Sequence, residues 1–466
     1  MNKFNLANVK KTLYYLKRNG IAATFYAAKE RMESNDGSNE ENPYTYCPPT
    51  SEEMEKQRNF THQMSPLISI LVPAYHTPKV FLEQLIDSLL EQTYREWELI
   101  LADASSDDQV KKIADTYKDK RICYLDIKGN EGISVNSNKA LKAAKGSYIG
   151  LLDHDDFLAP DALFWVVQEI NQGYQKGYEL SLIYTDEDKS NQYGSVFYSP
   201  HNKEKFNLDL ILSNNYICHF MVINSALLKK LEFRKEYDGA QDYDLVLRVV
   251  GELLTQQEEG KLPRGQLSDY IRHIPKVLYH WRCHDGSTAE NPASKEYAYK
   301  AGASAVQDFV NQRKYNAKVY PLKHLGFYGQ KYKDHIFHSR KDIAAIGGKL
   351  IKDHKITGGI YREDGTILYE GLNENYSGYM NRAVLCQNAD AVDIRCIQVR
   401  EECFRIFEQV VGISYEQYPG EEIFDYRLIP EGTDYVKLSI RLCKTLREAG
   451  YHILWNPETV QKIFEQ

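Results

Sequence analysis

The chain has 466 residues, enough for two or three domains with substantial cores. Its 58 basic and 65 acidic residues give a formal charge of −7, which argues against general nucleic-acid binding. No stretch approaches the roughly 18 apolar residues of a membrane span, and the start lacks a signal peptide's apolar core, so we expect a cytoplasmic protein. The eight cysteines show neither zinc nor disulfide spacing, as free thiols in a reducing compartment would.

Residues 1–32 form the first predicted element, a basic helical extension. They contain seven lysines and arginines but one acid, Glu30, and the helical pattern breaks at Asn19-Gly20. Such a helix suits either an anionic membrane surface or packing on the main domain, and the sequence leaves both open. An apolar stripe runs along it: Val9, Leu13 and Leu16.

Residues 33–65 are polar and contain three prolines, which is typical of a linker. A domain of alternating strands and helices is predicted over 66–312, with its first strands at 67–73, 97–102, 121–127 and 148–152 and helices at 80–92, 110–117 and 137–144. Short connections favour a Rossmann-like, mostly parallel α/β sheet with flanking helices. There is no G-x-G-x-x-G and no Walker A motif, which argues against a dehydrogenase or a P-loop enzyme.

The strand at 148–152 ends on three carboxylates: Asp153, Asp155 and Asp156. Acids at the carboxyl end of a strand face the crevice where open α/β sheets bind ligands. Two of them, spaced i and i+2, can hold a hard cation that in turn holds a diphosphate. The alternative is a polar turn that only opens the next helix.

Beyond Asp156 the pattern is less regular. Further strands are predicted at 180–184, 217–223 and 274–280, and further helices at 161–170, 225–231, 242–250 and 296–313, with a polar insertion at 252–270. Residues 313–340 are rich in Tyr, Lys and His and read as a connector. A smaller α+β domain is predicted over 341–466.

Seven ordered motifs in the large domain together resemble the family 2 glycosyltransferases, which have the GT-A fold. They are Ser69–Tyr75, Asp87–Tyr94, Trp97–Asp107, Gly129–Ser134, Leu151–Asp156, Gly239–Arg248 and His280–His284. The resemblance implies sugar transfer from a nucleotide donor. It covers the large domain and is specific because the seven motifs occur in order.

On the donor side, the resemblance implies that two segments bind the base and ribose. These are the loop after the first strand, with Pro73, Ala74 and Tyr75, and the acid after the second strand, Asp103. An acid at Asp103 would accept from a pyrimidine N–H, although it also suits a helix cap. Asn130 and Gly132 are similar to the family's donor-side loop, which is otherwise a plain turn.

Asp153 and Asp155 match the family's D-x-D, which implies Asp155 on Mg²⁺ or Mn²⁺ and Asp153 on the ribose or metal. His280 stands where related enzymes place a third metal ligand; His284 competes for that role, and a lone histidine is often structural. Asp242 is the implied catalytic base, although the family's preceding Glu is Gln241 here and Asp242 could simply cap a helix.

The domain at 341–466 looks like the acceptor half of a second, degenerate glycosyltransferase domain, with Asp434 faintly echoing Asp242. We expect it to be an accessory to a metal-dependent inverting enzyme that extends a bacterial surface glycan from dTDP-rhamnose or a UDP-hexose. The acceptor could be lipid-linked at the inner face of the plasma membrane, with peripheral contact through 1–32; a homo-oligomer is compatible with this scheme. The alternative is a non-catalytic scaffold that binds nucleotide or glycan.

Overall fold

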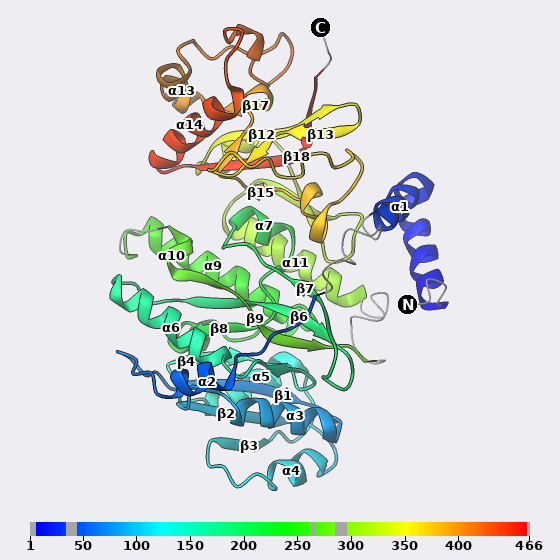
Figure 1. Ribbon diagram of the computed structural model, residues 1–466, viewed down its shortest axis with the longest axis vertical. Coiled ribbons are helices and arrows are strands. Elements are labelled where there is room, and N and C mark those ends of the chain that lie inside the picture. Colours follow the sequence, from blue (N-terminus) through cyan, green and yellow to red (C-terminus); the bar gives the residue numbers. More distant parts are fainter. Residues whose placement is uncertain (1–5, 34–43, 263–265, 285–295, 464–466) are drawn as a thin grey trace. The chain divides into compact units, whose positions relative to one another are not determined.

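The computed structural model describes residues 6–33, 44–262, 266–284 and 296–463, and it divides into two compact units (Figure 1). The large-sheet unit contains residues 44–206 and 215–313. The small-sheet unit contains the remaining described residues, including 207–214 from the middle of the chain. Within the described part, no helix is long and apolar enough to cross a bilayer.

The large-sheet unit is built on one nine-stranded sheet in the order β3-β2-β1-β4-β8-β6-β9-β5, with β7 paired to β6. Its strands are β1 (Ile68–Ala74), β2 (Trp97–Asp103), β3 (Ile122–Asp126), β4 (Tyr148–Leu151), β5 (Phe157–Leu158), β6 (Leu182–Ser190), β7 (Phe197–His201), β8 (Met221–Asn224) and β9 (Ile271–Arg282). The first four strands are parallel, whereas β8 runs antiparallel to both β4 and β6. This confirms the predicted α/β class.

Helices cover both faces of this sheet. They are α2 (Ser51–Arg58), α3 (Lys79–Leu90), α4 (Gln109–Ala114), α5 (Ile133–Ala143), α6 (Ala162–Gln175), α8 (Ser225–Leu231), α9 (Gln241–Glu258), α10 (Leu267–Tyr270) and α11 (Glu296–Gln312). The chain moves from β1 outward to β3 and then returns to β4 on the other side of β1. Because such crossovers are right-handed, α3 and α5 lie on opposite faces of the sheet (Figure 1).

The small-sheet unit is a smaller α+β domain, as predicted. Its five-stranded sheet has the order β13-β12-β18-β15, with β17 paired to β12. The strands are β10 (Ala317–Pro321), β11 (Tyr328–Tyr332), β12 (Ile343–Lys352), β13 (Lys355–Gly358), β14 (Ile360–Tyr361), β15 (Gln387–Asn388), β16 (Ala391–Val392), β17 (Ile397–Val399) and β18 (His452–Lys462). The helices are α1 (Leu6–Glu33), α7 (Leu208–Ser213), α12 (Ile336–Ser339), α13 (Phe404–Val411) and α14 (Tyr435–Glu448).

The predicted linker at 33–65 is wrong for its second half. Thr50 and Glu53 form a capping box that starts α2, and Asn171 binds both backbone groups of Met64. The signal was present as Thr-Ser-Glu-Glu, but the neighbouring prolines obscured it. Residues 34–43 of the linker, 1–5 of the extension, 263–265 of the insertion, 285–295 and 464–466 lie outside the described residues.

The predicted connector at 313–340 is also wrong, because it contains the β10–β11 hairpin and α12, which belong to the small-sheet unit. The helical extension packs on that unit as well. Glu30 accepts from the backbone amides of Ser377 and Gly378, and Arg18 donates to the carbonyl of Leu322. The predicted break in α1 is confirmed at Gly20, whose φ is 80°.

Candidate active site

The crevice lies between β1 and β4, where the order of the parallel strands reverses. Ala74 ends β1 beside Asp103 at the end of β2, and Asp153 follows the end of β4. Residues beyond the carboxyl ends of these strands take no part in strand pairing, so their side chains can contact a ligand. This is the position that the sequence predicted for the carboxylates.

Asp103 is buried and already hydrogen-bonded. One oxygen accepts from the amide of Ser105 at 2.9 Å, and the other accepts from the hydroxyl of Tyr124 at 3.0 Å. Each carboxylate oxygen has a second lone pair, so Asp103 keeps capacity for another donor. Tyr75, by contrast, is 48% exposed and stands at the surface.

The loop before α5 is shaped by Asn130 and Gly132. Asn130 accepts from the amide of Gly132 at 3.1 Å and from the side chain of Asn136 at 3.0 Å. Gly132 has φ 103°, and a Cβ there would lie 2.3 Å from a carboxylate oxygen of Asp238. The close approach of Asp238 therefore gives the glycine a structural reason in addition to its predicted role.

The three acids after β4 have different surroundings. The Asp153 side chain is half exposed, whereas Asp156 is buried and accepts from the backbone amide of Arg282 at 2.7 Å and from Tyr279. Asp156 thus ties the loop to β9. Asp155 points elsewhere, with one oxygen 2.9 Å from Nε2 of His284.

His280 does not approach Asp155 within the described residues. It is buried, its Nδ1 lies 2.6 Å from Asp188, and its ring packs among Tyr46, Phe157 and Phe197. The predicted metal-ligand role of His280 therefore finds no support in the geometry. The competing residue, His284, contacts Asp155 instead.

Asp242, the predicted base, lies in the first turn of α9. Its Oδ1 accepts from the amide of Tyr243 at 2.8 Å; its Oδ2 accepts from the Cys218 thiol at 2.7 Å and from Asn215 at 3.2 Å. These hydrogen bonds fix the orientation of the carboxylate. The sequence reading missed Asn215 and Cys218, since neither stands out in its segment.

A buried charge network lies behind Asp153. Nε2 of His219 is 3.8 Å from Asp153, and its Nδ1 is 3.2 Å from Glu187, which also contacts Lys203 at 3.3 Å. Burial alone would lower the pKa of His219, but Glu187 and Asp153 raise it to about 9. His219 is therefore a cation at neutral pH, and sequence reasoning missed it.

A small cavity of about 70 Å³ brings together three of the predicted residues, Pro73, Asp153 and Asp242, with His219 and Cys218 beside them. Burial raises the pKa of Asp153, although half of its side chain remains accessible; Asp155 and Asp242 add repulsion, and His219 opposes the shift. Asp103, Asn130, Gly132 and Asp155 do not line this cavity.

Among the described residues, no three His, Cys, Asp or Glu side chains gather as a metal cluster. Asp155 and His284 nevertheless supply two suitable donors on one side of the crevice. That set fits a cation such as Mg²⁺ or Mn²⁺, which binds one or two protein ligands and completes its shell with water and phosphate oxygens.

The fold and the crevice define an α/β protein of the nucleotide-binding kind. The profile of "Glycosyl transferase family 2" matches residues 69–232. An uncharacterized glycosyltransferase of Rickettsia typhi is 30% identical over 51% of this chain and 70% of its own length. The chain therefore belongs to the family 2 glycosyltransferases, as the motifs predicted.

Two other relatives are much longer. An uncharacterized protein of Sinorhizobium fredii is 39% identical over 53% of this chain and 26% of its own length. The O-antigen biosynthesis protein RfbC of Myxococcus xanthus is 29% identical over 54% of this chain and 19% of its own length. The chain thus spans only about a quarter or less of these two relatives. The crystal structure of S. aureus TarS is similar over 52% of this chain and 40% of that one, with 17% identity and a TM-score of 0.38.

Proposed function

We propose that the large-sheet unit transfers a sugar from a nucleoside-diphosphate donor to a hydroxyl of a glycan, with inversion at the anomeric carbon. The observation that carries this proposal is the cavity shared by Pro73, Asp153 and Asp242. It puts a predicted donor contact next to a carboxylate that can act as a base. Family membership supports the same chemistry.

Asp103 with Pro73, Ala74 and Tyr75 holds the base and ribose in this proposal. The spare lone pairs of Asp103 suit the N3–H of a pyrimidine, which favours uridine or thymidine donors. We therefore propose a UDP-hexose or dTDP-rhamnose. Asn130 and Gly132 form the neighbouring wall, and Asp153 faces the ribose.

Asp155 and His284 hold the divalent cation in this scheme, in place of the predicted set of Asp153, Asp155 and His280. When bound, the cation supplies positive charge against the leaving diphosphate. His219 adds a protein cation on the Asp153 side of the crevice. Its partners Glu187 and Lys203 are fixed by the fold, so that charge needs no rearrangement.

Asp242 takes the proton of the attacking hydroxyl at Oδ1 or Oδ2 while the sugar passes to the acceptor oxygen. The three donors around its carboxylate hold it in place at the cavity. Attack from the Asp242 side, opposite the diphosphate, inverts the anomeric centre.

The acceptor we propose is a growing bacterial surface glycan, which agrees with the O-antigen biosynthesis name of one relative. A lipid-linked acceptor would place the protein at the inner face of the plasma membrane. Residues Ile21, Phe25 and Met32 of α1 are 81%, 60% and 68% exposed, beside Lys29 and Arg31, which supports peripheral contact with anionic lipid. The small-sheet unit is then a degenerate accessory domain; Asp434 merely caps α14 there.

The test is binding and slow hydrolysis of uridine, thymidine and guanosine diphosphate sugars by the full chain, with Mn²⁺ and with EDTA. We expect one pyrimidine donor to bind with metal and to lose binding in Asp155→Ala. Asp242→Asn should bind that donor but not transfer its sugar. Binding without hydrolysis or transfer in the unmodified protein would favour the scaffold alternative, and absence of binding to every donor would overturn the proposal.

A further inference from the structure

Lys349 is a buried cation in the middle of an apolar strand. Residues 343–351 of β12 are all buried, and Lys349 is only 5% exposed. Its ammonium has no hydrogen bond or ion pair with any residue that the structure describes. A buried charge is costly unless it is paired, so an unpaired lysine in a strand requires an explanation.

The side chain lines a cavity of about 320 Å³ in the small-sheet unit, together with Tyr15 and Tyr26 of α1 and Phe327. Neutral polar side chains from the loop after β14 complete the wall: Asn375, Ser377 and Asn381. The cavity therefore combines aromatic faces and amides with two lysines, Lys349 and Lys323, and two acids, Glu30 and Glu458. Burial lowers the pKa of Lys349 to about 8, with Glu374 opposing that shift and Lys323 adding to it.

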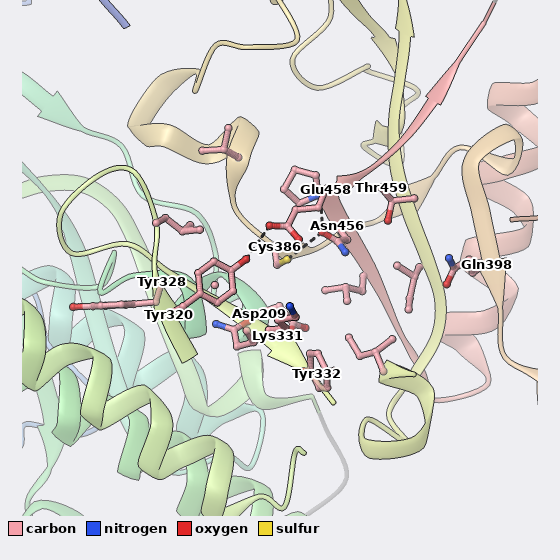
Figure 2. A pocket seen from close by; sticks show the side chains of 18 of the residues that line it. Asp209, Tyr320, Tyr328, Lys331, Tyr332, Cys386, Gln398, Asn456, Glu458 and Thr459 are labelled. Atoms are coloured by element: carbon pink, nitrogen blue, oxygen red, sulfur yellow. Dashed lines mark hydrogen bonds between the residues drawn. The ribbon is translucent and has the colours of Figure 1, made fainter. Parts of the chain in front are cut away.

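Glu30 and Glu458 line this cavity and Glu374 lies near Lys349, and all three acids already have hydrogen-bond partners. Glu30 accepts from two backbone amides, at 2.9 Å and 2.7 Å, and Glu374 contacts His354 at 2.6 Å. Glu458 accepts from the hydroxyl of Tyr320 at 2.8 Å (Figure 2). Lys323 also lines the cavity, and none of these acids forms an ion pair with Lys349, so its ammonium lacks an anionic partner among the described residues.

A second cavity of about 350 Å³ adjoins the first, since Leu322, Val384, Pro457 and Glu458 line both. Figure 2 shows it between Tyr320, Tyr328 and Asn456. Tyrosine faces pack on the C–H faces of sugars, and amide side chains both donate to and accept from hydroxyls. The two adjoining cavities, of about 350 and 320 Å³, are lined by groups suited to sugars.

We propose that these adjoining cavities bind a saccharide carrying a carboxylate or a phosphate, with its anionic group against Lys349. The saccharide part rests on the proposed function and makes the acceptor an acidic glycan; the anion site itself does not. The acidic group replaces water around the ammonium and completes its pairing. The site belongs to the small-sheet unit alone, so it is separable from donor chemistry in the large-sheet unit.

The test is calorimetric titration of the full chain, in phosphate-free buffer, with glucuronic acid, glucose 6-phosphate, glucose and inorganic phosphate. We expect both acidic sugars to bind, glucose to bind at least tenfold more weakly, and Lys349→Met to weaken the acidic sugars about tenfold or more. Lys355→Met, which removes an exposed lysine from the neighbouring β13, is the matched control and should change nothing.

Labelling of the unmodified protein with an amine-reactive reagent gives a second readout that needs no variant. Either acidic sugar should protect Lys349 and leave Lys355 unprotected. Absence of binding by both acidic sugars, or an equal effect of the two lysine variants, overturns the site. Equal affinity for inorganic phosphate and glucose 6-phosphate overturns the saccharide assignment. Donor hydrolysis, measured on the same samples, reports separately on the proposed transferase function.

Discussion

Replacement of Glu187 by Gln should destabilise the large-sheet unit strongly. The Lys203 side chain is fully buried, and its ammonium donates to the carbonyls of Ile217 and His219 as well as to Glu187 at 3.3 Å. Burial opposes ionisation of Glu187, yet Lys203 and His219 hold its pKa well below the usual value. Loss of the carboxylate leaves a buried cation without a counter-charge, which costs about 3–5 kcal/mol.

Replacement of the other member of the pair, Lys203, should cost less stability. In Lys203→Met, Glu187 keeps His219 at 3.2 Å and His201 at 3.6 Å as partners, so we expect roughly half of that loss. The double variant removes both charges and should be no less stable than Glu187→Gln alone. A coupling energy of about 2 kcal/mol or more would follow from that comparison.

Urea unfolding followed by far-UV circular dichroism measures these changes, and only the transition of the large-sheet unit should move. Glu83→Gln is the matched control, because Glu83 pairs with Lys79 at 3.7 Å on the surface. This substitution should lower the free energy of unfolding by less than about 0.5 kcal/mol. If Glu187→Gln costs no more than Glu83→Gln, the buried network is not a charge pair and this account of His219 fails with it.

Three further predictions concern the site. His219 has a pKa raised from 6.5 to about 9, so the stabilisation by its charge is complete below pH 6.5 and is lost as pH rises through 9. The urea concentration at the unfolding midpoint should therefore decrease as pH rises from about 7 to about 10, and His219→Gln should reduce this pH dependence. Asp155→Ala and His284→Ala should each weaken Mn²⁺-dependent donor binding at least tenfold, whereas His280→Asn should lower stability and leave donor affinity unchanged. If His280→Asn weakens donor binding and His284→Ala does not, His280 is the ligand. Asp242→Asn should lower transfer by about 10²–10⁴ at unchanged donor affinity, and retained transfer would exclude it as the base.

The sequence predicted the sheet well because its signals are local. Short apolar runs such as Leu67–Pro73 are typical of strands covered on both faces, and the order of strands and helices then limits the crossovers. The acids after β4 were predicted for the same reason, since a strand end determines where they stand. The helix α2 and the β10–β11 hairpin were missed, because the Pro, Tyr and Lys content of those segments outweighed a short capping or hairpin signal.

The choice between His280 and His284 could not be made from sequence. Neighbouring residues of a strand point to opposite faces, and β9 runs through Arg282 before the chain leaves the sheet. His280 is still inside the strand and faces an aromatic cluster; His284 lies past its end and can turn toward Asp155. Asn215, Cys218 and His219 were missed because side-chain contacts across the sheet leave no periodic trace.

The charges of the crevice explain why its acidic residues require positive charge beside them. Burial raises the pKa of Asp153, and repulsion from Asp155 and Asp242 adds to that shift; a diphosphate would add negative charge to this set. Positive charge must therefore enter with the donor or be built into the fold. His219 is the built-in part, since Glu187 and Lys203 fix it beside Asp153. In the proposed function, Asp155 and His284 hold the part that enters.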